Sequence, residues 1–215
     1  MEIAMKSDFT FIYSAPKVTD EKLPAVFLFH GYRSDEKDLL SLVANLESTH
    51  HIFSVRGPLS FMFGGYAFWD MQDLENPNLE QYQSAVESVQ NFIVNAITQY
   101  NLEKKDITLL GFSQGAVLVQ SIALRAQKLV NKVVALSGHL PYFAKDEEYA
   151  TLNLNKLHIF ISNGINDNVV PYAWGKESAD YFKKRGADVT FKSYFSGHYV
   201  SRDNARDLID FIVSN

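Results

Sequence analysis

The 215-residue chain contains no cysteine. Disulfide bonds, thiolate metal ligands and a cysteine nucleophile are therefore excluded. Long hydrophobic runs are also missing, since no stretch approaches the roughly 20 apolar residues that a membrane-spanning helix needs. Residues 1–8 carry two acidic side chains and no apolar segment of the kind found in signal peptides. We therefore expect a cytoplasmic protein with no membrane span.

Clusters of basic side chains are absent as well. The chain has 20 Lys and Arg against 25 Asp and Glu, which gives a formal net charge of −5. A mildly acidic chain without basic runs gives no reason to expect a nucleic-acid partner. Internal repeats and low-complexity segments are also lacking. A chain of this length can bury the core of one domain, which we expect to span residues 1–215.

Short apolar runs alternate with amphipathic runs along the chain. This is the pattern of an α/β protein, in which a mostly parallel sheet is flanked by helices on both faces. The run at residues 25–29 is continuously apolar, as in a strand buried on both faces. The first and last runs alternate more and should lie near the edges. We expect about seven strands, at residues 9–13, 25–29, 52–55, 107–110, 133–136, 157–161 and 189–195.

Helical patterns lie between these strands. The clearest places apolar side chains at a period near 3.6 from Tyr82 to Ile97, and Asn78 with Gln81 resembles a capping box at its start. The segment that follows the fourth strand is apolar almost all round and should be deeply buried. Further helices are expected at residues 39–46, 114–126, 171–185 and 204–213.

The longest irregular stretch covers residues 57–78 and is rich in aromatic residues and glycine. A loop of this length in a compact domain is usually functional or disordered, and its aromatic content argues against disorder. Gly64 and Gly65 indicate a tight backbone path or a close approach to a ligand. An alternative for each ring is that it caps the core. Candidates for substrate binding in this stretch are Phe61, Met62, Phe63, Tyr66, Phe68 and Trp69.

The segment Gly111-Phe112-Ser113-Gln114-Gly115 matches the G-x-S-x-G pattern of a nucleophile elbow. It directly follows a predicted strand and opens a predicted helix, which is the context that the motif requires. A serine at such a sharp turn adopts a strained backbone, and its neighbours two positions away must be small so that strand and helix do not collide. The sequence therefore predicts that Ser113 is a catalytic nucleophile.

Two residues on later loops can complete a catalytic triad, because hydrolases with this elbow order the triad as serine, acid, histidine. Asp167 and His198 each follow a predicted strand. His198 would take the proton of Ser113, and Asp167 would hold the imidazole tautomer and stabilise the imidazolium. Asp167 could also be a simple turn former. Its rivals, Asp180 and Asp188, lie on a helical pattern and at the start of a strand.

The other histidines receive different roles. His139 follows a predicted strand and is a candidate for lining the substrate site. His50 and His51 begin a strand, so their side chains point to opposite faces and cannot share a metal ion. His158 is expected to be structural. Since no pair has metal-ligand spacing on a helix, we expect no metal and no cofactor.

Acyl transfer requires two hydrogen-bond donors aimed at the developing oxyanion. One should be the N–H of Gln114, the residue after the nucleophile. The second should come from the loop after the strand at residues 25–29. Gly31 allows the backbone of that loop to approach a substrate closely, and we assign the second donor to the Tyr32 N–H. The same loop can also serve as a turn before a helix, and the two interpretations are compatible.

Together these motifs resemble the phospholipase/carboxylesterase family of small serine esterases, which includes the acyl-protein thioesterases. The resemblance implies an α/β-hydrolase fold and an activity on carboxylic esters. Asn163 departs from the family pattern, in which a histidine is common before the glycine. The absence of a lid domain is also indicated by the chain itself, because residues 138–156 are too few to form one. The resemblance rests on residues 29–32, 56–58, 64–70, 111–116, 136–141, 167–171 and 197–198.

Three functions remain compatible with the sequence. The first is a serine carboxylesterase that hydrolyses short- to medium-chain esters through an acyl-enzyme intermediate. The second is an acyl-protein thioesterase or lysophospholipase with the same site and a different substrate. The third is a ligand-binding protein that uses this fold without catalysis, since fold alone does not fix function. The expected partner is a small-molecule ester, and the oligomeric state is left open, with a homodimer among the alternatives.

Overall fold

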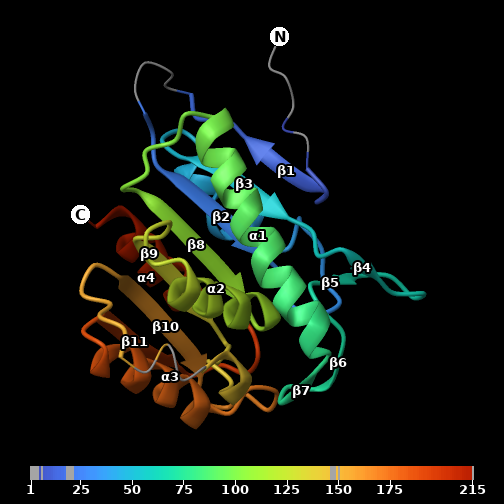
Figure 1. The fold of residues 1–215 in the computed structure, drawn as a ribbon. Helices are drawn as coiled ribbons and strands as arrows, with labels where there is room; N and C mark the ends of the chain where they lie inside the picture. Colours follow the sequence, from blue (N-terminus) through green and yellow to red (C-terminus); the bar gives the residue numbers. More distant parts are fainter. Residues whose placement is uncertain (1–4, 6, 18–21, 146–148, 150, 215) are drawn as a thin grey trace.

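The computed structural model describes residues 5, 7–17, 22–145, 149 and 151–214, and its centre is a seven-stranded sheet (Figure 1). All neighbouring strands are parallel except the first pair, in which β1 runs antiparallel to β3. The predicted mostly parallel α/β sheet is confirmed. Its order is β1 (Phe11–Ser14), β3 (His51–Val55), β2 (Ala25–Phe29), β8 (Ile107–Phe112), β9 (Lys132–Leu136), β10 (His158–Gly164) and β11 (Asp188–Tyr194).

Burial follows the hydrophobic pattern of the strands. Every residue of β2 is fully buried, as its unbroken apolar sequence predicts for a strand covered on both faces. The residues of β1 are half-buried, and those of β11 are half-buried or exposed. These two strands form the edges of the sheet, where the alternating sequences predicted them.

Four long helices cover the sheet on its two faces (Figure 1). α1 (Leu79–Gln99), α2 (Gln114–Arg125) and α3 (Tyr172–Lys184) contribute to one apolar core. α4 (Arg202–Val213) contributes to a second core on the opposite face, through Leu208 and Ile212. As predicted, α2 is buried almost all round, because it packs across the central strands β2, β8 and β9.

The prediction of a single helix at residues 39–46 is wrong. The chain forms two short 3-10 turns there, at Leu40–Leu42 and Ala44–Leu46. Val43 has φ −114° and ψ 10°, outside the helical region, so the two turns do not merge into one helix. The apolar side chains still face the second core, which explains why the pattern looked helical.

The capping box predicted at the start of α1 forms only in part. The Asn78 side chain accepts the Gln81 N–H at 3.1 Å, as a helix N-cap should. The Gln81 side chain instead accepts the N–H of Asp70 at 2.8 Å. This contact ties the preceding loop to the helix.

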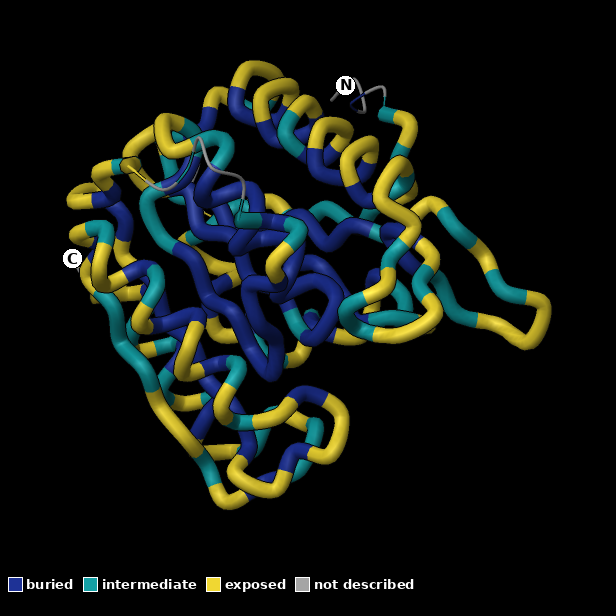
Figure 2. The backbone as a smooth tube through the Cα atoms, turned by 60° about the horizontal axis from the view of Figure 1, so that its bottom comes forward, coloured by how far each residue is buried: buried dark blue, intermediate teal, exposed yellow. Residues whose placement is uncertain are grey.

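The aromatic stretch at residues 57–78 folds into two small hairpins. One pairs β4 (Leu59–Ser60) with β5 (Tyr66–Ala67), and the other pairs β6 (Met71–Asp73) with β7 (Asn76–Pro77). The β4–β5 hairpin projects from the body of the molecule, and its tip is exposed (Figures 1 and 2).

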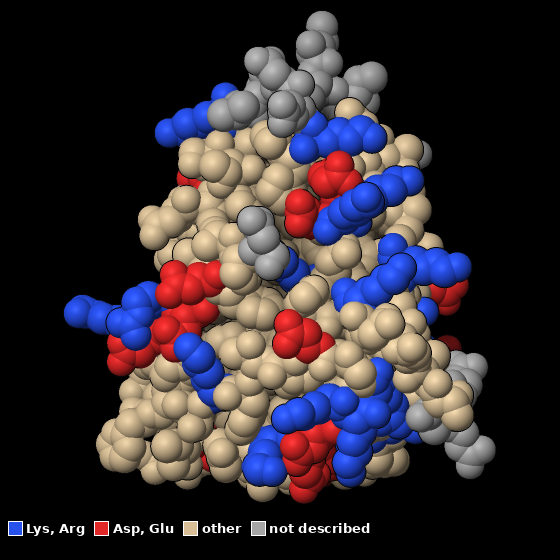
Figure 3. All heavy atoms as spheres, turned by 90° about the vertical axis from the view of Figure 1, so that its left-hand side faces the viewer, with Lys and Arg blue, Asp and Glu red and all other residues tan. Residues whose placement is uncertain are grey.

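Charged side chains of both signs lie next to one another on the face shown in Figure 3. Ion pairs also occur at α4, where Lys192 pairs with Asp207 at 2.9 Å and Arg206 with Asp203 at 3.1 Å. That face therefore presents no extended field of one sign. Among the described helices, none combines the length and apolarity that crossing a bilayer would require.

Candidate active site

The turn from β8 to α2 places Ser113 in a strained conformation. Its backbone has φ 54° and ψ −112°, a region that residues other than glycine rarely adopt. A Cβ atom on Gly111 would overlap the Gly115 carbonyl, and one on Gly115 would overlap the Phe29 carbonyl. The two glycines therefore let strand, turn and helix pack at the distance that this conformation requires.

Three residues from different loops form a continuous hydrogen-bonded chain. His198 Nε2 lies 3.0 Å from Ser113 Oγ, and His198 Nδ1 lies 2.8 Å from Asp167 Oδ2. The Asp167 side chain is fully buried, whereas the His198 side chain keeps 20% of its surface exposed. The His198 ring also packs against Phe112, with 4.9 Å between ring centroids. This arrangement can move a proton from the serine to the histidine while the carboxylate orients the ring.

Asp167 is held by the loop that follows it. Its second oxygen, Oδ1, accepts the N–H groups of Val169 and Val170, each at 2.8 Å. These bonds satisfy the oxygen that does not face His198 and orient the other toward the ring. A buried carboxylate with this many donors has the hydrogen bonds that its charged form needs.

The acid loop (residues 165–171) and the base loop (residues 195–201) pack directly on each other. The N–H of Ile165 donates to the Tyr194 carbonyl at 2.8 Å, and that of Asn166 donates to the Ser196 carbonyl at 3.0 Å. Gly164 lies so close to Ser196 that a side chain there would overlap its backbone. The parallel pairing of β10 and β11 brings the two loops to the same edge of the sheet.

The rival acids lie in other surroundings. Asp180 pairs with Lys176 on the exposed surface of α3 at 3.0 Å, and Asp188 pairs with His158 at the start of β11 at 3.0 Å. The pair of Asp188 and His158 lies at the amino ends of β10 and β11, opposite the ends that carry Asp167 and His198. Among the described residues, no group of three or more His, Asp or Glu side chains could hold a metal ion.

The oxyanion loop (residues 30–34) lies against the nucleophile. A Cβ atom placed on Gly31 would lie 3.2 Å from the Phe112 ring and 3.4 Å from Ser113 Cβ, so the loop passes in direct contact with the nucleophile turn. In the described part of the chain, the N–H groups of Tyr32 and Gln114 donate no backbone hydrogen bond. Neither predicted donor is therefore occupied by a backbone carbonyl within the described residues.

The β4–β5 hairpin supports this loop from outside. The Tyr66 N–H donates to the Ser34 carbonyl at 2.7 Å, and Gly65, with φ 83°, packs on the Arg33 carbonyl where a side chain would overlap it. Arg33 itself has φ 63°. The close approach that Gly65 allows is thus to backbone rather than to a ligand.

A partly exposed ion pair anchors the same region. The Arg56 guanidinium donates to both carboxylate oxygens of Glu36, at 2.5 and 2.6 Å, and it lies 4.4 Å from the centroid of the Tyr66 ring. This hydrogen bonding lowers the pKa of Glu36. On the other side of the loop, the Tyr32 hydroxyl donates to Asp70 at 2.7 Å, and burial together with this bond raises the pKa of Tyr32.

The six candidate substrate-binding residues of the aromatic stretch fall into separate environments. Phe68 and Trp69 are 1% and 2% exposed and belong to the core, where an ester cannot reach them. Met62 and Phe63, at the hairpin tip, are 92% and 96% exposed. Phe61 and Tyr66 are half-buried, and the ring of Phe61 packs edge-on to Tyr32 at 5.2 Å.

The side chain of Gln114 connects the elbow to the aromatic stretch, a role that the sequence did not reveal. Its Oε1 accepts the Phe68 N–H at 2.9 Å and its Nε2 donates to the Trp69 carbonyl at 2.8 Å. Because Gln114 directly follows Ser113, these two bonds fix the backbone of the buried aromatic residues to the turn that carries the nucleophile.

His139 is buried and bound to a carboxylate. Its Nε2 lies 2.6 Å from Glu75 Oε1, and its ring packs on Trp174 at 4.7 Å. Burial lowers the pKa of His139, and the hydrogen bond to Glu75 opposes this effect in part. His139 therefore ties the β6–β7 hairpin to the loop after β9, and with 4% of its surface exposed it offers little contact to a substrate.

A cavity of about 420 Å³ lies between the oxyanion loop and the acid loop. We name it the Leu74 cavity. Its apolar lining includes Tyr32 from the oxyanion loop and Val169 from the acid loop, with Met71, Leu74 and Trp174 between them. Sequence reasoning missed these last three residues, although Met71 and Leu74 belong to the aromatic stretch that it singled out.

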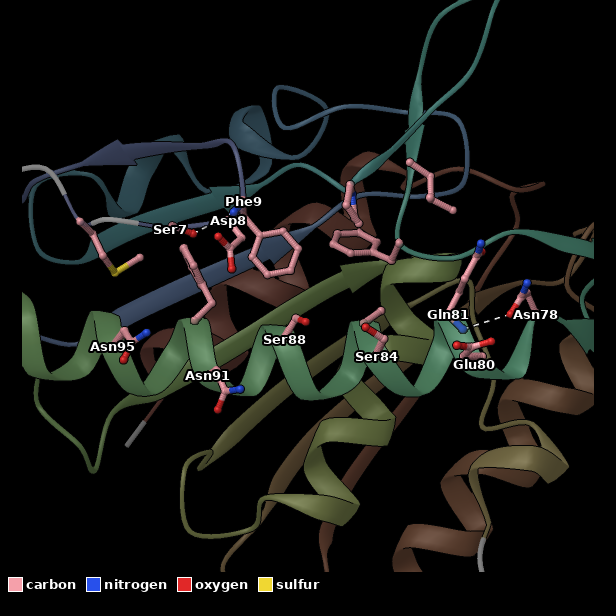
Figure 4. Close-up of a pocket in the computed structure, with 16 residues that line it drawn as sticks. Ser7, Asp8, Phe9, Asn78, Glu80, Gln81, Ser84, Ser88, Asn91 and Asn95 are labelled. Atoms are coloured by element: carbon pink, nitrogen blue, oxygen red, sulfur yellow. Dashed lines mark hydrogen bonds between the residues drawn. The ribbon is translucent and has the colours of Figure 1, made fainter.

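A larger cavity, of about 740 Å³, lies elsewhere, between the N-terminal segment and α1 (Figure 4). Ser84, Ser88, Asn91 and Asn95 line it at helical spacing from α1, and Phe9 faces them. As far as the structure describes the two linings, neither includes a residue of the hydrogen-bonded triad; residues of the oxyanion and acid loops line the Leu74 cavity, and none of them lines the larger cavity. Its size therefore does not make it the reaction site.

Comparisons with known proteins support the family resemblance and the fold. Residues 15–215 match the family described as Phospholipase/Carboxylesterase. The chain is 26% identical to "Acyl-protein thioesterase 1" of Candida albicans over 213 residues, which cover 87% of this chain and 90% of the relative. A carboxylesterase of Bacillus cereus superimposes with a TM-score of 0.84 at 21% identity, over 95% of this chain and 93% of that one. The α/β-hydrolase fold implied by the motifs is thereby confirmed.

Proposed function

The chain belongs to the phospholipase/carboxylesterase family, and from this membership we propose that it is a serine esterase acting on short- to medium-chain carboxylic esters. The observation that carries the proposal is the chain of hydrogen bonds from Ser113 through His198 to Asp167, with distances of 3.0 and 2.8 Å. A ligand-binding protein would have no use for a strained serine in contact with a base.

In the acylation step, Ser113 Oγ attacks the carbonyl carbon of the ester while His198 Nε2 takes its proton. The tetrahedral intermediate then collapses. The bond to the leaving oxygen breaks, and that oxygen takes the proton from His198. Asp167 stabilises the imidazolium that exists between these two transfers.

The oxyanion of the intermediate is stabilised by the N–H groups of Tyr32 and Gln114. Both are backbone donors on segments that are held by other contacts, so they need no reorganisation as charge develops. Deacylation repeats the sequence with water, which His198 deprotonates so that it attacks the acyl-enzyme. Serine and neutral histidine are restored when the acid leaves.

The Leu74 cavity suits an apolar substrate chain. Tyr32 and Trp174 both line it. Its lining surface is mostly apolar, although Gln72, Asp73 and Glu75 also contribute. Each buried methylene group should contribute about 0.8 kcal/mol to binding. Because the cavity is open and only about 420 Å³ in volume, the gain in kcat/KM with chain length should level off at medium chains.

A second candidate is hydrolysis of thioesters on acylated proteins. It is favoured by the relative named acyl-protein thioesterase, which aligns over 87% of this chain. The same triad and oxyanion donors would serve, since only the leaving atom changes from oxygen to sulfur. Rates on an oxyester and a thioester with the same acyl group would separate the two candidates.

The experiment that tests the proposal is a matched pair of acid variants assayed with p-nitrophenyl butyrate. Asp167→Asn should lower kcat by about 10³- to 10⁴-fold, because the ring loses its orienting carboxylate. Asp180→Asn, on the exposed face of α3, should stay near wild type. The proposal is wrong if the wild-type protein shows neither turnover nor a burst of p-nitrophenol. The assignment of Asp167 as the acid is wrong if Asp180→Asn loses activity while Asp167→Asn stays near wild type.

A further inference from the structure

His30 is a buried histidine that the reaction steps above do not use. It is 1% exposed and lies directly after β2, as the first residue of the oxyanion loop. Its ring packs on Phe68, with 5.1 Å between centroids. Both ring nitrogens have partners, and these partners define which nitrogen carries the proton.

The contacts select one tautomer of the neutral ring. The backbone N–H of Gly57 donates to His30 Nε2 at 2.9 Å, so Nε2 must present its lone pair. The hydrogen is therefore on Nδ1, which lies 2.7 Å from the Gly31 carbonyl oxygen and donates to it. His30 thus accepts from one backbone group and donates to another.

The bond to Gly31 sets the orientation of a peptide group. The described backbone contains no cis peptide bond, and in a trans peptide the C=O and N–H groups point in opposite directions. The N–H in the same plane as the Gly31 C=O belongs to Tyr32. The Ser34 N–H also donates to the Gly31 oxygen, at 3.2 Å, so this carbonyl is held from two sides.

We propose that His30 is a positioning residue, which holds the Gly31 carbonyl away from the active site and thereby aims the Tyr32 N–H at the oxyanion. The inference rests on the proposed function, since it concerns the donor used in that reaction. His30 touches no reacting atom. Its effect should therefore appear in the stabilisation of the intermediate and hardly in the binding of the substrate.

The surroundings keep His30 in its neutral form. Burial lowers its pKa, and the hydrogen bond to Gly31 and the carboxylates of Asp38, Asp35 and Glu36 oppose this with smaller effects. A second proton would be bound to Nε2, where it would point at the Gly57 N–H, so that two hydrogen-bond donors would face each other. The neutral tautomer that holds Gly31 is thus also the one that the fold tolerates.

Two isosteric variants separate the two hydrogen bonds of His30. The side-chain amide of Asn reaches about as far as Nδ1, and that of Gln about as far as Nε2. In His30→Asn the amide can therefore still donate a hydrogen bond to the Gly31 carbonyl. In His30→Gln the amide can accept the hydrogen bond from the Gly57 N–H but cannot reach the Gly31 carbonyl. We expect the Gln variant to lose about 10²-fold in kcat with little change in KM, and the Asn variant to retain most of its activity.

A boronic acid inhibitor supplies the second readout, because its adduct with Ser113 carries an oxygen in the position of the oxyanion. Its affinity should fall in the Gln variant in parallel with kcat and should be kept in the Asn variant. Urea unfolding of both variants controls for stability. Equal losses of kcat and inhibitor affinity in the two variants, or losses that follow the change in stability alone, would overturn the positioning role. Turnover by the wild-type protein would in that case still support the proposed function.

The tautomer can also be measured without any variant. In protein labelled with ¹⁵N-histidine, the His30 ring should show a protonated Nδ1 and an unprotonated Nε2 at neutral pH. A ring protonated at Nε2 alone could not donate to Gly31, and this result would refute the proposal even if both variants failed to fold.

Discussion

The tip and the base of the aromatic stretch have similar compositions and opposite environments. Met62 and Phe63, at the tip of the β4–β5 hairpin, are 92% and 96% exposed. Phe68 and Trp69, a few residues later, are 1% and 2% exposed. The difference comes from the partners of the base, since Gln114 binds the backbone of both buried residues and Tyr82 packs on the Trp69 ring at 5.2 Å.

This comparison shows that an aromatic-rich loop beside an active site can serve two purposes. The base supports the elbow through Gln114 and supports His30 through the Phe68 ring. The tip leaves two large apolar side chains in solvent, while the hairpin below it holds the oxyanion loop through Tyr66. Substitutions at the base should therefore change stability and all activity, and substitutions at the tip should change neither.

The largest effect should follow removal of the buried indole. Trp69→Ala should lower the free energy of unfolding by about 3–5 kcal/mol, the cost of truncating a large core side chain. At temperatures where the variant stays folded, kcat/KM should fall by similar factors for acetate and hexanoate esters, because the elbow is loosened for every substrate. A loss confined to the longer ester would instead place Trp69 in contact with the acyl chain.

A smaller effect should come from acidification. Burial lowers the pKa values of His30, His50 and His139 from their usual value of 6.5. Between pH 6.5 and those lowered values, these histidines bind more protons in the unfolded chain than in the folded protein. The stability that the neutral histidines provide above pH 6.5 is therefore lost as the pH falls through this range. Each group contributes at most about 1.4 kcal/mol per pH unit.

Urea unfolding at pH 7.5 and 5.5 measures this loss. His30 of the oxyanion loop packs on Phe68 at the base, whereas Met62 and Phe63 at the tip do not titrate, so His30→Asn should reduce the pH dependence and Phe63→Ala should leave it unchanged. Stability that did not fall over this range would contradict the burial of neutral histidines. The lowered pKa of Glu36, usually 4.5, matters only at lower pH.

The smallest effect is expected at the tip. Phe63→Ala should change the free energy of unfolding by less than about 0.5 kcal/mol, because the side chain makes no buried contact. Kinetics on soluble p-nitrophenyl esters should also stay near wild type at every chain length. A selective loss on medium-chain esters would show that the tip folds over the Leu74 cavity during the reaction.

The sequence predicted most of the fold and the residues of the candidate triad. Continuous apolar runs such as residues 25–29 identify central strands, because only strands covered on both faces lack polar positions. The alternating runs at residues 9–13 and 189–195 identified the edge strands, and the positions of Ser113, Asp167 and His198 at strand ends followed from motif context. Their distances in the structure agree with that prediction, whereas their catalytic roles stay a prediction.

Other features depended on contacts between distant segments. Nothing in the local sequence separated Phe63 from Trp69, because burial was decided by Gln114 and Tyr82. Likewise, apolar spacing at residues 39–46 could not reveal that Val43 interrupts the helix. The sequence analysis assigned no role to His30, although its position before Gly31 was a signal that its ring could reach the loop backbone.

The central claim is that Ser113 is the nucleophile, and covalent labelling tests it most directly. A fluorophosphonate incubated with the folded protein, followed by proteolysis and mass spectrometry, should place one adduct on the peptide that contains Ser113. The Ser113→Ala variant should remain folded, unlabelled and at least about 10³-fold less active. An adduct on another serine, or full esterase activity in the alanine variant, would contradict the account.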